Sequence, residues 1–173
     1  VGGARFWNDG TAELVAHREF LEEQRYLTEL NPYLHQRNRV LFPWLPEQPL
    51  TLPGLNFRGL SPDRLVSPEA PFAFSVGDRS FVALALSGAE GSDNLVLWLP
   101  DEGILFSGDF FGPLFPQFPN IFTMRGEKTR RPFEFMRAID QILALQPTTL
   151  LPSHGSVVSG SDYIASNMLR IRD

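Results

Sequence analysis

Three polar side chains follow apolar runs of the sequence, at places where a folded scaffold presents reactive groups. Glu90, Asp109 and His154 each come within a few residues of the end of such a run. Carboxylates and imidazole are suitable ligands for zinc, manganese or iron. A metal held in this way lowers the pKa of its bound water to about 7 and so produces a hydroxide nucleophile. The three residues therefore predict a hydrolytic metal site.

Each of these residues also has an ordinary structural interpretation. Asp109 belongs to a Ser-Gly-Asp stretch that is typical of turns, and His154 in Pro-Ser-His-Gly can cap a loop. Glu90 stands between an alanine and a glycine and can simply be solvated. Taken singly, none of the three distinguishes a ligand from a loop residue.

Composition narrows the classes of function. The chain has no cysteine, which excludes disulfides, thiolate metal sites and a cysteine nucleophile. Its net charge of −5 and scattered basic residues argue against a nucleic-acid partner, and the only dense basic spot is residues 125–131. No apolar run reaches the length of about 20 residues that a membrane span needs, and no leader is visible. We expect a soluble, cytoplasmic protein without membrane contact.

The elements that must position the three residues are visible as periodic segments. Short apolar runs joined by turn residues predict two hairpins, and a helical repeat beginning at Pro132 is followed by a strand and a last helix. This order predicts one α/β domain over residues 1–173 with layered helices and sheet. Because the strands are almost entirely apolar, we expect both faces of the sheet to be covered. The predicted elements are a strand at 14–16, a helix at 18–30, hairpin strands at 72–76, 80–86, 95–99 and 104–107, a helix at 132–145, a strand at 148–151 and a helix at 161–172.

A proline-rich excursion interrupts this pattern between residues 32 and 71. It contains eight prolines, and proline removes the amide donor that helix interiors and inner strands require. Asn31-Pro32 is therefore expected to end the first helix. The apolar side chains of the excursion, among them Phe42 and Trp44, predict that it packs against the body or against a partner.

Together the motifs resemble those of a known family. The stretch LPDEGILFSGD, from Leu99 to Asp109, and the later PSHG are similar to the third and fourth metal motifs of the metallo-β-lactamase superfamily. The resemblance implies that Asp109 bridges two metals and that His154 binds one of them. Zinc, or manganese or iron, is the implied cofactor, and Asp109 is the implied catalytic residue.

Further stretches resemble the alkyl-sulfatase-like branch of that superfamily. Residues 119–126 and the residues after His154 are similar to that branch, and Gly88-Ala89-Glu90 stands where other members have Gly-His-Thr. Glu90 is thus the implied third ligand, with Asp93 as a competitor. Alkyl sulfatases have a Glu at the bridging position, where this chain has Asp109. The SGDFFG stretch also resembles the di-iron domain of flavodiiron proteins.

The resemblance begins after the family's first motif, HxHxDH, which supplies most of the metal ligands. Val1-Gly2-Gly3 is similar to the residues that follow this motif, and His17 matches a structural residue. We therefore expect a partial αββα sandwich without its first strands and with an incomplete ligand set, which binds zinc or manganese weakly or not at all. Arg125 is expected to bind a sulfate or phosphate group, whereas Arg130 is expected in a solvated turn.

Two hypotheses about function follow. In the first, the chain belongs to a lineage of metal-dependent hydrolases that split small esters or sulfate esters, and it is inactive unless a further segment or another chain supplies the missing ligands. In the second, it is a non-catalytic remnant that folds as a homodimer through an exposed sheet edge.

Overall fold

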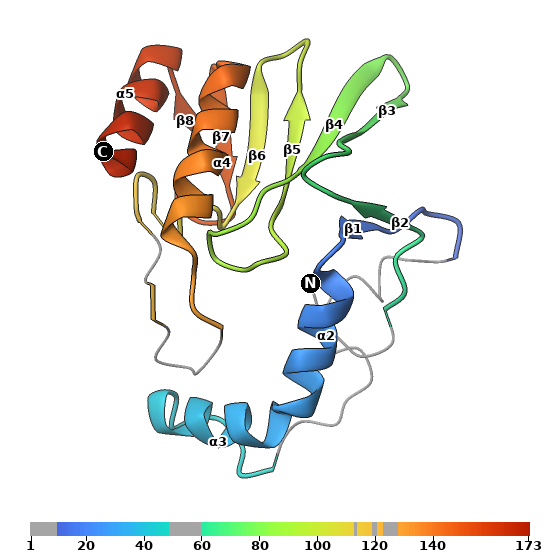
Figure 1. The fold of residues 1–173 in the computed structure, drawn as a ribbon, viewed down its shortest axis with the longest axis vertical. Helices are drawn as coiled ribbons and strands as arrows, with labels where there is room; N and C mark the ends of the chain where they lie inside the picture. Colours follow the sequence, from blue (N-terminus) through green and yellow to red (C-terminus); the bar gives the residue numbers. More distant parts are fainter. Residues whose placement is uncertain (1–9, 49–59, 113, 119–120, 123–127) are drawn as a thin grey trace. The chain divides into compact units, whose positions relative to one another are not determined.

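The computed structural model describes residues 10–48, 60–112, 114–118, 121–122 and 128–173 of the chain (Figure 1). These residues group into two compact units. The first contains residues 10–48, 60–65, 122 and 128–129, and the second contains residues 66–112, 114–118, 121 and 130–173. This division into units does not test the expectation that residues 1–173 form one domain, which stays a prediction. None of the described helices is long and apolar enough to cross a membrane.

The first unit begins with a short strand and two consecutive helices. Strand β1 (Val15–His17) is followed by α2 (Phe20–Glu29) and α3 (Asn31–Leu41). The first helix thus ends just before Asn31-Pro32, as expected, but a second helix follows at once inside the proline-rich excursion, where no helix was predicted. Pro32 lies in the first turn of α3, where its missing amide hydrogen would have had no partner inside the helix.

The rest of the excursion returns the chain to β1. Strand β2 (Arg64–Val66) forms a two-stranded sheet with β1, and Asp63 and Arg64 donate backbone hydrogen bonds to the Leu14 carbonyl at 2.9 and 3.2 Å. Trp44 contacts the Phe42 ring at a centroid distance of 5.2 Å but is 77% exposed. The expectation that this segment packs against the body or against a partner stays a prediction. Residues 49–59 of the excursion lie outside the described residues.

The second unit is built on a mixed six-stranded sheet in the order β3-β4-β5-β6-β7-β8. All neighbours are antiparallel except β6 and β7, which are parallel because α4 (Pro132–Leu145) connects them. The two predicted hairpins, the crossover helix and the final α5 (Ser161–Arg172) are confirmed. The strands are β3 (Phe72–Val76), β4 (Arg79–Ala85), β5 (Leu95–Leu99), β6 (Ile104–Gly108), β7 (Thr149–Pro152) and β8 (Val158–Ser159).

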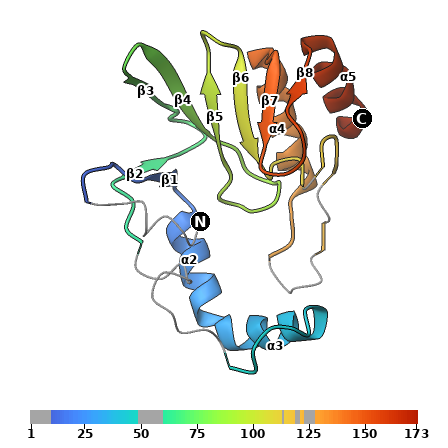
Figure 2. The ribbon, with the colours of Figure 1, turned by 180° about the vertical axis from the view of Figure 1, so that it is seen from behind.

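Both helices of this unit lie on one face of the sheet, as the two opposite views show (Figures 1 and 2). Phe135, Ile139 and Ile142 recur at helical spacing on α4 and are completely buried. Alternate residues of the central strands, such as Leu105 and Leu150, meet them in a single apolar core. This packing holds the ends of β6 and β7 in place.

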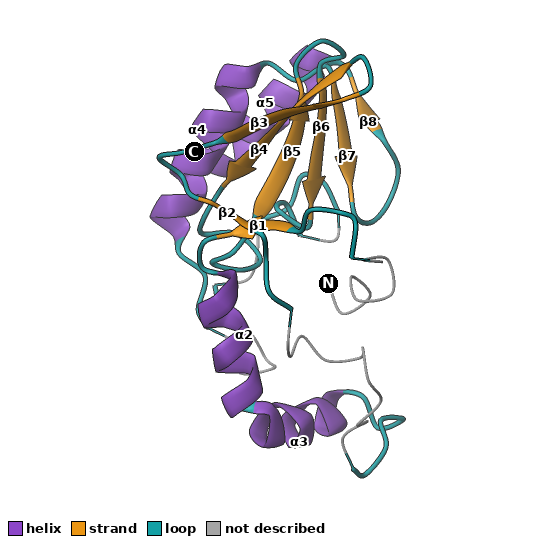
Figure 3. Ribbon diagram, turned by 90° about the vertical axis from the view of Figure 1, so that its right-hand side faces the viewer, coloured by secondary structure: helices purple, strands orange, loops and turns teal. Residues whose placement is uncertain are grey.

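The opposite face of the sheet carries no helix among the described residues of the second unit (Figure 3). Ala83 and Leu99 on that face are buried, but Phe106 is 43% exposed. The expectation that both faces are covered therefore holds only in part.

Candidate functional site

Asp109 and His154 lie at the same edge of the sheet because they follow two parallel strands. β6 ends at Gly108 and β7 ends at Pro152, and these two residues are partners in the parallel register. Gly108 adopts a positive φ of 56°, which turns the chain sharply after the strand. The Ser153 amide donates to the Gly108 carbonyl at 3.2 Å and ties the two strand ends together.

Two aromatic side chains anchor the turn that carries Asp109. Phe110 and Phe111 are buried in the core, and the Phe110 ring stacks on Phe135 of α4 at 5.1 Å. Within the turn, the Gly112 amide donates to the Asp109 carbonyl at 2.8 Å. The backbone of Asp109 is thus held by the core, while its side chain remains partly accessible.

The side chains of Asp109 and His154 face each other. Asp109 Oδ1 lies 3.5 Å from His154 Nε2, which is longer than a good hydrogen bond. This Oδ1 is buried and accepts no hydrogen bond within the described residues. His154 is 60% exposed at its side chain, so the pair combines a buried oxygen with a mostly exposed imidazole. Both atoms are suitable metal donors.

Glu90 has a different environment. It follows β4 in the loop to β5, and its Oε1 lies 2.7 Å from Nη2 of Arg130, whose side chain is only 7% exposed. A buried guanidinium needs such a partner, because an uncompensated charge in the interior is strongly unfavourable. The expectation that Arg130 lies in a solvated turn is therefore wrong.

Backbone contacts join the same loop to the start of α4. The Arg131 amide donates to the Gly88 carbonyl at 3.3 Å. Gly88 has a φ of 97°, and a Cβ built there would overlap the Phe135 amide nitrogen and lie 2.7 Å from the Arg131 carbonyl oxygen. Only glycine fits this approach. The Glu90–Arg130 pair is therefore one part of a close contact between the loop and the helix start.

In the basic segment at residues 125–131, each described basic side chain has an acidic partner. Arg130 has Glu90, Arg131 lies 3.5 Å from Glu134, and Lys128 lies 2.8 Å from Glu23. Partial burial acts to lower the pKa of the Lys128 ammonium, but hydrogen bonds and charges from the glutamates of α2 outweigh it and raise that pKa. Arg125, the predicted anion ligand, lies outside the described residues.

The other two histidines and Asp93 lie in local environments of their own. His17 is buried, and its Nδ1 accepts a hydrogen bond from the Glu19 amide at 3.0 Å, in keeping with a structural role. His35 Nε2 lies 3.0 Å from the Pro46 carbonyl oxygen. The Asp93 side chain lies close to Gly91. A Cβ added to Gly91 would be 2.7 Å from Oδ1 of Asp93.

The predicted trio can be tested as a metal site from these contacts. Two ligands at about 2.1 Å from one tetrahedral ion stand about 3.4 Å apart, so the 3.5 Å between Asp109 and His154 suits such an ion. Glu90 is not added to them, because no group of three or more possible ligands occurs in the described part of the chain. Two donors are fewer than the three of a usual catalytic zinc site. The described residues therefore do not make up a complete metal site.

Sequence comparison finds one similar stretch. No family model matches the sequence. A linear primary-alkylsulfatase from Pseudomonas sp. (strain ATCC 19151) is 34% identical over 85 residues. The match covers 49% of this chain and 16% of that protein, so the chain corresponds to a small part of its relative.

Structural comparison extends over nearly the whole chain. A double mutant of the sec-alkylsulfatase PisA1 superposes on 100% of this chain and 29% of its own, with a TM-score of 0.72 at 20% identity. A metallo-beta-lactamase family protein from Thermus thermophilus covers 96% of this chain and 54% of its own, with a TM-score of 0.64 at 19% identity. The chain thus has part of the metallo-β-lactamase fold, which confirms the expected fold class.

Proposed function

We propose that this chain forms the part of a sulfate-ester hydrolase that carries Asp109 and His154, and that it is inactive without further metal ligands. These ligands would come from a segment outside the described residues or from another chain. The substrate class is a small sulfate ester, and the cofactor is zinc, manganese or iron. A cytoplasmic location and the absence of nucleic-acid and membrane partners remain predictions from composition.

The observation that carries the proposal is the Asp109–His154 pair. A carboxylate oxygen that is buried without a hydrogen-bond donor costs free energy unless a cation or a proton compensates it. The Asp109 oxygen lies 3.5 Å from Nε2 of His154, a distance that suits a shared cation. The stretch of identity to a linear primary-alkylsulfatase favours sulfate esters over other esters.

A metal in a complete site would supply Lewis acidity and an acidic bound water. In this chain Asp109 would accept the cation at its buried oxygen, and the core would hold the Asp109 turn rigid through Phe110. His154, whose side chain is mostly exposed, would be the second ligand. The Glu90 carboxylate stays with Arg130, so it adds no third ligand in the observed arrangement.

Two measurements on the purified chain test this proposal. Calorimetry should show weak zinc or manganese binding or none, and an assay on a long-chain alkyl sulfate should show sulfate release no faster than buffer. Tight binding of two metals per chain, with turnover that Asp109→Ala abolishes, would show that the site is already complete.

A complementation assay tests the substrate class. Joining the chain to a segment that bears an HxHxDH motif should restore alkyl-sulfate hydrolysis, and Asp109→Ala should remove it again. Ser166→Ala on α5 serves as a control, because that exposed position is outside the candidate site. Restored metal binding without hydrolysis of any alkyl sulfate would contradict the sulfate-ester assignment.

A further inference from the structure

We propose that β3 is the surface through which two copies of this chain associate, antiparallel and about a two-fold axis at Phe74. β3 is an edge strand of the six-stranded sheet (Figure 1). Folded proteins protect such edges with charged residues, prolines or bulges within the strand. β3 has the sequence FAFSV and pairs with β4 without a register shift, so it has none of these devices.

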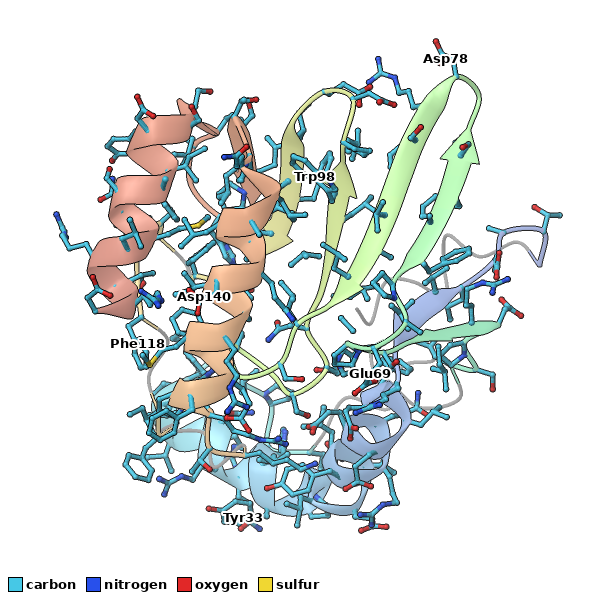
Figure 4. The ribbon with its side chains drawn as sticks, turned by 45° about the horizontal axis from the view of Figure 1, so that its top comes forward. Tyr33, Glu69, Asp78, Trp98, Phe118 and Asp140 are labelled. Atoms are coloured by element: carbon cyan, nitrogen blue, oxygen red, sulfur yellow. The ribbon has the colours of Figure 1, made fainter. Side chains whose placement is uncertain are left out.

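The hairpin turn determines which backbone groups of β3 point outward. Val76 and Arg79 are partners across a two-residue turn, in which Gly77 has a φ of 62° (Figure 4 shows Asp78 at its tip). The pair that closes such a turn exchanges hydrogen bonds, and hydrogen-bonded pairs then alternate along the ladder. The amides and carbonyls of Ala73 and Ser75 therefore point away from β4.

These outward groups are available to a partner. The backbones of Ala73 and Ser75 form no hydrogen bond outside the β3–β4 ladder within the described residues. A two-fold axis at Phe74 places Ala73 of one copy opposite Ser75 of the other. By the same symmetry, Ser75 of the first copy lies opposite Ala73 of the second. Both pairs would then exchange hydrogen bonds, about four in total.

Other axes along the same strand are less favourable. An axis at Ala73 would place Ser75 opposite Pro71 of the second copy, which has no amide hydrogen to donate. An axis at Ser75 would place Ala73 opposite Gly77, which belongs to the turn rather than to the strand. Phe74 is thus the centre that keeps every pair inside β3.

The side chains are complementary in the same register. Phe72, Phe74 and Phe81 form a stacked row with ring centroids 5.2 Å apart on the sheet face without helices. Val76 lies on the same face and is 63% exposed. In the proposed dimer Phe74 meets its own copy and Val76 meets Phe72, so the aromatic row continues across the axis. Cross-strand aromatic and β-branched pairs of this kind stabilise sheets.

Matched lysine substitutions at the two sheet edges test the site. Sedimentation velocity over a range up to about 100 µM should show a reversible dimer, because so small an interface predicts a dissociation constant on the order of micromolar. Ser75→Lys should weaken it at least about tenfold, since a charge must then enter the pairing edge. Ser159→Lys, an exposed serine on the opposite edge strand β8, should not change it.

Single cysteines test the register, because the chain has no cysteine of its own. Mild oxidation should cross-link Phe74→Cys with itself, since residues on the axis face each other within disulfide range. Val76→Cys should not cross-link, because Phe72 lies opposite it. A wild-type monomer throughout the concentration range, a dimer that Ser75→Lys leaves intact, or cross-linking of Val76→Cys alone would overturn the proposal. Unchanged far-ultraviolet circular dichroism of each variant excludes misfolding as the cause.

Discussion

The loop after β4 and the turn after β6 each carry a carboxylate that the sequence predicts to be a metal ligand, Glu90 and Asp109. The surroundings of these two carboxylates in the structure are opposite in kind. Glu90 is bound to the buried Arg130 guanidinium, and its loop contacts the first turn of α4 through Gly88. Asp109 has a buried oxygen that accepts no hydrogen bond from any described residue, and an imidazole lies 3.5 Å away. Within the described residues, the Glu90 carboxylate thus has a buried cationic partner, whereas Asp109 Oδ1 has no hydrogen-bond donor.

The difference shows how a carboxylate's surroundings decide its role. A charge paired in the interior contributes to the fold, and separating it from its partner costs several kcal/mol in general. A carboxylate that lacks such a partner can accept a cation instead. We therefore expect changes near Glu90 to affect mainly stability and changes at Asp109 to affect mainly metal binding.

The largest expected effect comes from Gly88 in the loop after β4, with Gly155 beside the Asp109–His154 pair as its comparison. Gly88→Ala should lower the free energy of unfolding by about 3 kcal/mol or more, because its Cβ would overlap the backbone of α4. Gly155→Ala, next to His154, should cost only about 1 kcal/mol, because φ is 79° there but the nearest described atom, Leu114 Cδ2, is 3.7 Å from the added Cβ. Urea unfolding followed by fluorescence of the buried Trp98 measures both. Equal losses would show that the loop does not contact α4 closely.

The buried ion pair should give the next largest effect. Arg130→Ala is expected to lower the free energy of unfolding by about 2–3 kcal/mol, somewhat less than for a fully buried pair because Glu90 is 34% exposed. A double-mutant cycle with Glu90→Gln should give a coupling above about 1 kcal/mol. Additive effects of the two substitutions would contradict the view that the pair acts as a unit.

Weak metal binding should separate the two regions directly. In a zinc titration followed by nuclear magnetic resonance, the His154 ring signals should shift, and Asp109→Asn should reduce the affinity by about tenfold or more. Glu90→Gln should leave the affinity unchanged, because Glu90 is held by Arg130. Loss of binding in the Glu90 variant would place Glu90 among the ligands.

The smallest effect is expected at the neighbouring exposed pair. Arg131 lies 3.5 Å from Glu134, with side-chain exposures of 55% and 37%. Glu134→Ala should change the free energy of unfolding by less than about 0.5 kcal/mol, because solvent screens exposed pairs. The change in the free energy of unfolding caused by Glu134→Ala, measured in the same urea series, is the reference against which the effect of Arg130→Ala is compared. A loss as large as that of Arg130→Ala would mean that exposure does not explain the difference.

Sequence periodicity predicted most of the second unit correctly. Apolar alternation and turn residues marked both hairpins, and Pro132 marked the start of α4, because these signals are local. The main error in the elements was α3, where the proline density of residues 32–71 hid the fact that Pro32 occupies a permitted position. A proline's effect depends on its place in the helix, which composition does not give.

The sequence by itself determined that Asp109 and His154 end two strands and that both are metal-ligand types, since residue type and local pattern carry that information. Only the tertiary structure decided that the two strands are parallel neighbours, which brings the side chains within 3.5 Å. The tertiary structure also decided that Glu90 forms an ion pair with Arg130. The two residues are 40 positions apart in the chain, and no local sequence signal links them. The choice between a ligand and a structural ion pair is made by packing, which brings together groups that are distant along the chain.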